Sequence, residues 1–256
     1  MALKVIADLH SATDALKNEV SPEDILLLLG DLVNIVDYRE MSGIMVRLYG
    51  EDVVRQVVDL RAAGRIDEAR LLMASTREGK EAEFASRFGE FLRKEYRKVF
   101  AAIPCPAYLV FGNVDHPKLI EELKGPGVVN ADGMVVPILG LDFGFVAGGL
   151  PTPLQIPGEV SEERYDSMLM GLGEVDVVCS HIPPAIPELT YDTLAKRSER
   201  GSVKLIEYIT RFEPRLVLFG HVHQPLISSM HIGRTHVVNA GYFRRTKRAI
   251  ELPLWG

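Results

Sequence analysis

The chain of 256 residues is long enough to bury a substantial core, and its composition, 47% apolar and 25% charged, is typical of a globular protein. The net charge of −6 and the isoelectric point near 5.7 give no overall electrostatic reason to bind nucleic acid or an anionic membrane. Two cysteines are too few for a disulfide scaffold, and no apolar run has membrane-spanning length.

The chain begins with a strand–helix–strand pattern. Apolar strands are predicted at Val5–Ile6 and Ile25–Leu29, with a helix at Ser11–Val20 between them and Ser11 or Thr13 as its N-cap. The second strand is expected to be buried on both faces, because no polar residue interrupts it. Since a helix joins the two strands, we expect them to be parallel.

A helical block then interrupts the strands. Between residues 36 and 100, glycine and proline are scarce and apolar residues recur at helical spacing, with breaks at Gly64 and Gly79 that predict two or three helices. We interpret this block as an insertion into a core formed by residues 1–35 and 101–256. It would serve as a cap that offers an arginine to an anionic substrate, or as a layer through which two copies associate.

The second half of the chain predicts further short strands and helices. The strands are predicted at Ala107–Phe111, Val135–Gly140, Phe143–Gly149, Val175–Cys179 and Leu216–Phe219. The helices are predicted at Pro117–Lys124, at Ser161–Leu172 with Ser161 as its cap, and at Ser202–Phe212.

The tail from His231 to Leu252 predicts short antiparallel strands. Its clustered basic residues are interpreted as a solvated strand face and not as a nucleic-acid site. These residues are Arg244, Arg245, Lys247 and Arg248.

Five of the predicted strands end in side chains that can bind a metal ion. Because the carboxyl ends of strands in open α/β sheets meet in a crevice, we expect these side chains to lie together. Carboxylate and imidazole groups with one amide oxygen suit Mn, Fe, Co, Ni or Zn, and the lack of thiolate argues against a structural zinc site. The endings contain Asp8, His10, Asp31, Asn113, His181, His221 and His223.

The five endings, in the order Asp-x-His, Gly-Asp, Gly-Asn, His and Gly-His-x-His, resemble the calcineurin-like metallophosphoesterase family. The resemblance runs from Lys4 to about Gly241, outside most of the block at 36–100. It implies an α/β fold with a two-sheet αββα sandwich core, here with an inserted α-helical cap.

The resemblance also implies two divalent metal ions, among which we favour manganese. The first ion would be bound by Asp8, His10, Asp31 and His223. The second would be bound by Asp31, Asn113, His181 and His221. Asp31 would bridge the two ions and so be essential for catalysis, and Asn113 would also contact the substrate.

The implied activity is hydrolysis of a phosphate ester by a hydroxide that bridges the two metal ions, without a covalent intermediate. Phosphodiesters are favoured over monoesters, because compact relatives that lack the motif histidine often act on diesters. Two alternatives stay open. One is a non-catalytic scaffold on the same fold, which would predict eroded ligands, and the other is a nuclease, which the acidic balance disfavours.

One position departs from the family pattern. Val114 stands where the family commonly has the histidine that protonates the leaving group. Either His116 acts as the general acid, the substrate has a good leaving group, or catalysis is lost. Asp115, which would orient the missing histidine, predicts a local capping role instead. The hypothesis for His116 fails if a His116→Ala variant keeps the high-pH limb of the rate profile.

No signal-peptide pattern precedes the first strand, so we expect a cytoplasmic protein. Its expected partner is a phosphate-ester substrate. We expect no membrane and no nucleic-acid partner, and we expect any homo-oligomer to form through the helical block.

Overall fold

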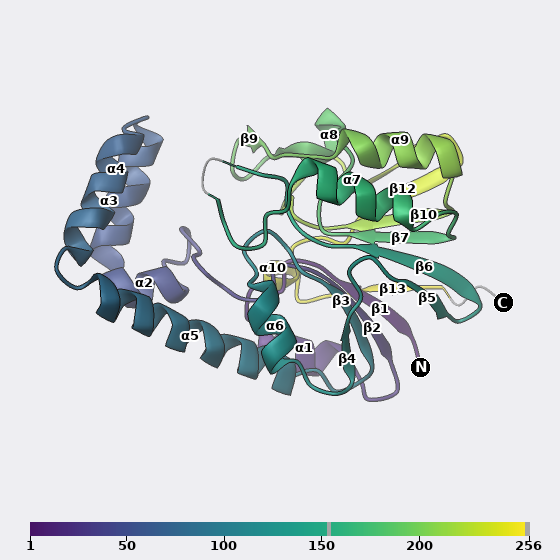
Figure 1. The fold of residues 1–256 in the computed structure, drawn as a ribbon, viewed down its shortest axis with the longest axis horizontal. Helices are drawn as coiled ribbons and strands as arrows, with labels where there is room; N and C mark the ends of the chain where they lie inside the picture. The colour runs from purple at the N-terminus through teal and green to yellow at the C-terminus, as the bar shows by residue number, and fades with distance from the viewer. Residues whose placement is uncertain (153–154, 254–256) are drawn as a thin grey trace.

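Two β-sheets pack face to face at the centre of the computed structural model, which describes residues 1–152 and 155–253 (Figure 1). The five-stranded sheet has the order β13-β1-β2-β3-β4, and only β13 is antiparallel to its neighbour. Its strands are β1 (Leu3–Ile6), β2 (Ile25–Leu29), β3 (Ala107–Val110), β4 (Val128–Asn130) and β13 (Ile250–Leu252).

The six-stranded sheet has the order β11-β12-β10-β7-β6-β5. Its four inner strands are parallel, and the two outer strands run antiparallel to their neighbours. The strands are β5 (Val135–Ile138), β6 (Leu141–Val146), β7 (Val177–Ser180), β10 (Leu216–Phe219), β11 (Ser229–Ile232) and β12 (Thr235–Asn239). A separate hairpin pairs β8 (Tyr191–Asp192) with β9 (Arg197–Ser198).

Helices cover the outer faces of both sheets (Figure 1). On the side of the five-stranded sheet these are α1 (Thr13–Glu19) and α6 (Pro117–Leu123), and on the side of the six-stranded sheet they are α7 (Glu162–Gly171), α8 (Pro187–Thr190) and α9 (Val203–Phe212). The predicted α/β fold with two packed sheets is therefore confirmed. No helix in the described ranges combines the length and apolar character needed to cross a bilayer.

The predicted buried strand is confirmed as β2, in which Leu26 to Leu29 are at most 1% exposed. The N-cap predicted for the first helix is wrong, since Ala12 precedes α1 and no side chain caps it. Ser11 instead uses its hydroxyl to accept a hydrogen bond from the backbone N–H of Asn34, at 3.1 Å. The N-cap predicted at Ser161 is confirmed. The structure also shows Ser202 as the N-cap of the 202–212 helix, where only the helix was predicted.

The block at 36–100 forms four helices, one more than the upper prediction, because Gly50 adds a break at a φ of 86°. The helices α2 (Ile44–Tyr49), α3 (Glu51–Ala62) and α4 (Ile66–Arg77), with the first half of α5 (Glu81–Ala101), project from the core (Figure 1). Whether this projection acts as a cap stays a prediction.

The tail departs from its prediction in two ways. The predicted antiparallel pairing is present between β11 and β12 and between β13 and β1, but β12 also lies parallel to β10 on its other side. The basic cluster does not form a strand face, because its first half belongs to the short helix α10 (Phe243–Thr246). One of its residues, Arg244, contacts the backbone of His10 and the side chain of Asp37.

The second half of α5 anchors the projecting helices to the core. Tyr96 is fully buried there and donates its hydroxyl hydrogen to a carboxylate oxygen of Asp115, at 3.0 Å. The same hydroxyl accepts the backbone N–H of His116, at 2.7 Å. A single side chain of α5 thus contacts the loop that follows β3.

We expect the Tyr96→Phe variant to lower the free energy of unfolding by about 1–3 kcal/mol, because a buried carboxylate and a backbone N–H each lose a partner. The measurement is urea denaturation. The control is Tyr108→Phe in β3, whose ring lies 6.0 Å from Phe145 and whose hydroxyl has no hydrogen bond within the described chain. An equal loss in both variants would contradict this account.

Candidate metal centre

The structure brings all seven predicted ligand side chains to neighbouring strand ends. The five-stranded sheet supplies four of them, and the six-stranded sheet supplies three from the opposite side of the interface. Asp8 and His10 follow β1, Asp31 follows β2, Asn113 follows β3, His181 follows β7, and His221 and His223 follow β10.

The first group of candidate ligands contains Asp8, His10 and His223, which each offer one atom within 4.8 Å of the others. The Nε2 atoms of His10 and His223 are 3.2 Å apart. A carboxylate oxygen of Asp8 lies 3.8 Å from His223 Nε2, and one of Asp31 lies 3.8 Å from His10 Nε2. These four side chains are therefore close enough to surround one cation.

The second group contains Asp8, Asp31 and His181. Asp31 Oδ1 lies 3.6 Å from His181 Nε2, and the amide oxygen of Asn113 lies 3.0 Å from the same nitrogen. The amide oxygen is also 3.1 Å from His221 Nδ1. Both aspartates therefore lie between the two sets of histidines, whereas the resemblance assigns the bridging position to Asp31 alone.

The hydrogen bonds of the histidines test whether these residues fit a metal ion. His181 Nδ1 is 2.8 Å from the carbonyl oxygen of Leu29, and His10 Nδ1 is 3.3 Å from that of Val33. Since a carbonyl oxygen only accepts, both Nδ1 atoms carry the hydrogen and both Nε2 atoms carry a lone pair. The lone pair of His181 then faces the amide oxygen of Asn113, as a cation between them would require.

A second test is the buried oxygen Asp8 Oδ1, which has no hydrogen-bond donor in the described chain. Its partner oxygen Oδ2 accepts the backbone N–H of His221, at 3.0 Å. A buried carboxylate oxygen without a partner is costly, and a divalent cation removes that cost. The donor set therefore fits borderline divalent metal ions.

Burial also sets the charges of the site. It raises the pKa of Asp31 to about 7, and together with the charge of Asp31 it raises the pKa of Asp8. It lowers the pKa values of His181 and His223 to about 4. The imidazoles are therefore neutral at physiological pH, which is the form that binds metal.

A family model described as calcineurin-like phosphoesterase matches residues 1–225. The chain belongs to this family. No curated protein matches this phosphoesterase. One solved structure is 17% identical, covers 94% of this chain and 90% of its own, and has a TM-score of 0.57. The crystal structure of TT1561 of Thermus thermophilus is 12% identical, covers 99% and 98%, and has a TM-score of 0.51. At these identities, both structures support the fold alone.

Four candidate ligands of the phosphoesterase have backbone angles that only glycine adopts easily. The φ angles are 53° at Asp8, 39° at His10, 52° at Asp31 and 70° at His221. Such strain is maintained where the surrounding structure needs a side chain in one position, and it clusters at functional sites. The turns after β1, β2 and β10 are therefore shaped to direct these side chains inward.

Two of the strand-end motifs of this phosphoesterase contain a glycine, Gly30 and Gly112, because no side chain fits at either position. A Cβ atom at Gly112 would lie 2.1 Å from Asp31 Oδ1, and one at Gly30 would lie 2.6 Å from His181 Nδ1. Neither position has room for a side chain. The two glycines thus let the loops after β2 and β3 pack against the ligands.

The capping role predicted for Asp115 is wrong. His116 is the residue before α6, and no side chain caps that helix. The carboxylate of Asp115 is fully buried and accepts the backbone N–H groups of Leu32 at 3.0 Å and Gly112 at 2.9 Å. It therefore ties the loop that carries Asp31 to the loop that carries Asn113, although no helix-cap pattern reveals this.

Two residues beyond the last motif support the centre and were missed in the sequence. The ring of Tyr242 stacks on His223, with ring centres 3.9 Å apart and planes at 4°. Arg244 donates to the backbone oxygen of His10 at 2.8 Å and lies 3.5 Å from Asp37. The solvated role predicted for Arg244 is therefore wrong, and no motif spacing distinguishes it from the other basic residues of its cluster.

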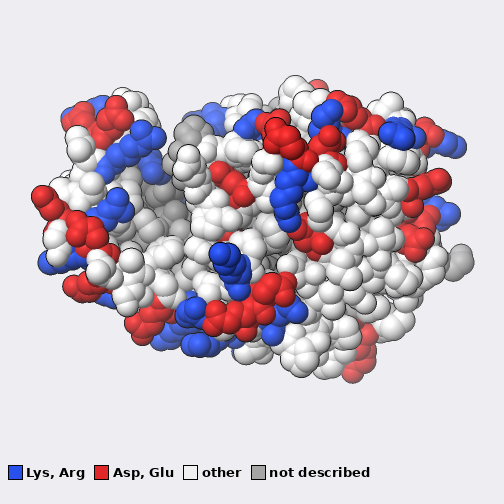
Figure 2. Space-filling view, viewed as in Figure 1, with Lys and Arg blue, Asp and Glu red and all other residues white. Residues whose placement is uncertain are grey.

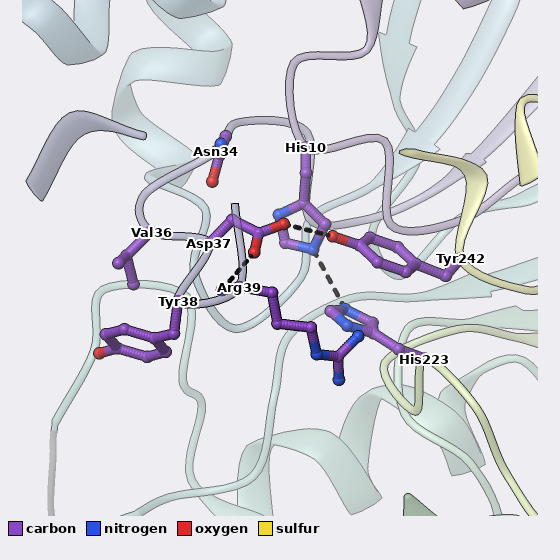
Figure 3. A pocket seen from close by; sticks show the side chains of 8 residues that line it. All are labelled: His10, Asn34, Val36, Asp37, Tyr38, Arg39, His223 and Tyr242. Carbon is purple, nitrogen blue, oxygen red and sulfur yellow. Dashed lines mark hydrogen bonds between the residues drawn. The ribbon is translucent and has the colours of Figure 1, made fainter. Parts of the chain in front are cut away.

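A cavity of about 140 Å³ opens beside His10 and His223 (Figure 3). The side chain of Arg39 extends toward His223 in this view. Burial is the main cause that lowers the pKa of His223, and the positive charge of Arg39 lowers it further. No carboxylate of the described chain forms a salt bridge with Arg39. The remaining wall residues are Asn34, Val36, Asp37, Tyr38 and Tyr242.

His116, the candidate general acid, turns its ring toward α5, with its centre 6.2 Å from that of Phe88. Burial lowers its pKa. Its ring faces Phe88 of α5, and its role as general acid stays a prediction. Val114 contacts the candidate metal centre through its backbone, because its N–H donates a hydrogen bond to Asp31 Oδ1 at 3.2 Å.

Buried carboxylates predict how the metal-free protein responds to pH. The folded pKa of Asp31, about 7, exceeds its usual 3.8, so its protonated form stabilises the fold and this contribution is lost as pH rises through 7. After treatment of both proteins with a chelator, we therefore expect Asp31→Asn to gain roughly 1–4 kcal/mol of stability over the unsubstituted chain between pH 5 and 8.

The measurement is thermal or urea denaturation of both proteins at each pH. The comparison within one pH removes the opposite contribution of the histidines, which are shared by both chains. With metal ions added, the order should reverse, because the ions bind the carboxylate. A constant difference across this pH range would contradict the burial of an ionisable Asp31.

Proposed function

We propose that this phosphoesterase hydrolyses phosphodiesters with two divalent metal ions, manganese being favoured. The observation that carries the proposal is the convergence of seven metal-binding side chains at neighbouring strand ends, together with Asp8 Oδ1, a buried oxygen without a donor in the described chain. Asp8, His10, Asp31 and His223 would hold one ion. Asp31, Asn113, His181 and His221 would hold the other. When bound, the ions would supply a hydroxide near neutral pH and positive charge for the phosphate oxygens.

The protein's contribution is to hold these ligands in fixed orientations. The carbonyl oxygens of Leu29 and Val33 orient the rings of His181 and His10, so that their lone pairs point inward. The ring of Tyr242 keeps His223 in plane. No side chain is needed as a nucleophile, because water attack on phosphorus requires only orientation and charge.

Arg39 is the residue that we propose to bind a non-reacting phosphate oxygen. Its position is fixed by Asp37, whose Oδ1 accepts the backbone N–H groups of Arg39 at 2.9 Å and Glu40 at 3.0 Å. A guanidinium without a carboxylate partner is suited to donate to phosphate. One arginine beside two metal ions matches the single negative charge of a diester better than the double charge of a monoester.

The leaving group must be accommodated without the usual histidine. Val114 cannot transfer a proton, and the ring of His116 contacts Phe88. We therefore propose that the preferred diesters have leaving groups that depart without strong acid assistance, with His116 as the alternative acid.

A small ester is favoured over a nucleic acid by the charge distribution. On the face shown in Figure 2, basic and acidic residues are interspersed, with no continuous basic groove. Tight binding of a polyanion usually depends on such a groove.

The central experiment measures metal content and ester hydrolysis together. We expect about two bound manganese ions per chain, and faster turnover of bis-p-nitrophenyl phosphate than of p-nitrophenyl phosphate. Asp31→Asn should lose at least about 100-fold in kcat/KM, because both ions lose a ligand. The control is Asp24→Asn, a buried carboxylate that accepts the backbone N–H groups of Ala2 and Ser21. Turnover in the presence of a chelator, or faster hydrolysis of the monoester than of the diester, would contradict the proposal.

The role of Arg39 makes a separate prediction. We expect Arg39→Ala to raise KM for the diester by about 10- to 100-fold, because a charge-assisted contact to phosphate is lost. Arg39→Lys should recover part of the loss. The control is Arg55→Ala on the exposed face of α3, where the arginine pairs with Glu51. If both alanine variants behave alike in steady-state kinetics, Arg39 does not bind the substrate.

A further inference from the structure

An apolar space adjoins the cavity at the metal centre. A second cavity, of about 60 Å³, shares the wall residues Val36 and Tyr38 with the first. Val54 and Val57 of α3, together with Met73 of α4, contribute to its walls. The polar surface beside His223 thus gives way to an apolar surface across one tyrosine.

The apolar surface continues beyond this second cavity. A third cavity, of about 400 Å³, shares Met45, Tyr49 and Met73 with the second and extends to Phe84 and Phe88 of α5. The rings of Tyr49 and Phe84 contact each other edge to face, with centres 5.1 Å apart. The three cavities therefore adjoin one another from the metal centre to the inner side of the projecting helices.

The projecting helices do not close this space by packing on the sheets. The main contacts of α3 are with α4 and α2, and those of α2 are with α3 and α5. Met45, Tyr49 and Met73 are consequently only half-buried. Figure 2 shows a recess between the projection and the core. Protein interiors are normally packed without such gaps, so an open apolar wall indicates a surface that something else covers.

Tyr38 marks the boundary between the polar and apolar spaces. The residue is 40% exposed, and its hydroxyl accepts a hydrogen bond from Arg61 of α3, at 2.8 Å. The neighbouring Asp37 is held by the hydroxyl of Tyr242 at 3.2 Å. The tyrosine is thus attached to the projection on one side and, through the chain, to the metal centre on the other.

We propose that the substrate carries a hydrocarbon group, which lies between α2, α3 and α4 while the phosphate lies at the metal centre. This inference rests on the proposed function and specifies its substrate class. A hydrocarbon group attached to phosphate fits because the first cavity and the more apolar second cavity share the wall residues Val36 and Tyr38. The charged group on the wall of the second cavity, Arg61, donates to the hydroxyl of Tyr38. Arg77 and Glu81 lie on the wall of the third cavity.

Binding of alkylphosphonates tests this inference without turnover, because the carbon–phosphorus bond is not a phosphate ester. The probes are methyl-, butyl- and octylphosphonate, titrated calorimetrically into the manganese-loaded protein. Each methylene that enters an apolar cavity should tighten binding about threefold, so we expect Kd to fall at least about 30-fold from methyl to octyl.

Two variants locate the hydrocarbon. Met73→Trp fills the apolar wall and should abolish the gain with chain length. Leu71→Trp is the matched control, because Leu71 is 68% exposed on the same helix and lines none of the three cavities. It should keep the full gain. Thermal denaturation checks that both variants are folded.

The outcomes separate this inference from the proposed function. Phosphonate binding that tightens with chain length, without any ester hydrolysis, would support the hydrocarbon site and contradict the catalytic proposal. If the protein hydrolyses diesters but the Kd of the phosphonates does not change with chain length, the catalytic proposal is supported and the hydrocarbon site is contradicted. If that Kd does not change with chain length and the protein is dimeric in solution, a second copy covers the apolar surface and the inference fails. If Met73→Trp folds and keeps the gain, the hydrocarbon lies elsewhere and the inference fails.

Discussion

The structure depends on one electrostatic constraint, namely that two carboxylates and four imidazoles share a space from which water is largely excluded. Burial raises the pKa values of both Asp8 and Asp31, and the charge of Asp31 raises that of Asp8 further. Hydrogen bonds to carbonyl oxygens turn the imidazole lone pairs into the same space. Negative charge and lone pairs are stable together there only with positive charge between them, and divalent ions supply it most compactly.

The scaffold around this charge is equally constrained. Asp115 holds the loops after β2 and β3 through two backbone N–H groups, and Tyr96 of α5 donates to the same carboxylate. Burial raises the pKa of Asp115 to about 7, with the charge of Asp31 adding to it. Three strained ligand turns and the close approach of Gly112 to Asp31 leave little freedom. The helix that starts in the projection therefore ends as a support of the metal centre.

The sequence predicted what periodicity and strand endings encode. The apolar run of β2 and the cap at Ser161 were accessible, because each depends on neighbouring residues. The two packed sheets were accessible only through the resemblance of the strand endings to a known family. Residues that act by meeting a distant segment were not. In the sequence, Arg244 is indistinguishable from the other basic residues of its cluster. Only the folded chain shows that α10 places it beside the carbonyl oxygen of His10. The role of Asp115 likewise arises from loops 83 residues apart in the chain.

The turn after β2 joins the two surfaces that the substrate would meet. Asp37 and Ser42 exchange backbone hydrogen bonds at 2.9 and 3.1 Å, and this closed turn carries both Tyr38 and Arg39. Arg39 extends to the polar side, whereas Tyr38 reaches Arg61 of the projecting helices. Because Asp37 is itself held by Tyr242 and Arg244, the geometry of the phosphate site and that of the apolar wall have a common origin. Recognition of the proposed substrate's phosphate and of its organic group would thus be set by one short segment, placed where the chain passes from the core to the projecting helices.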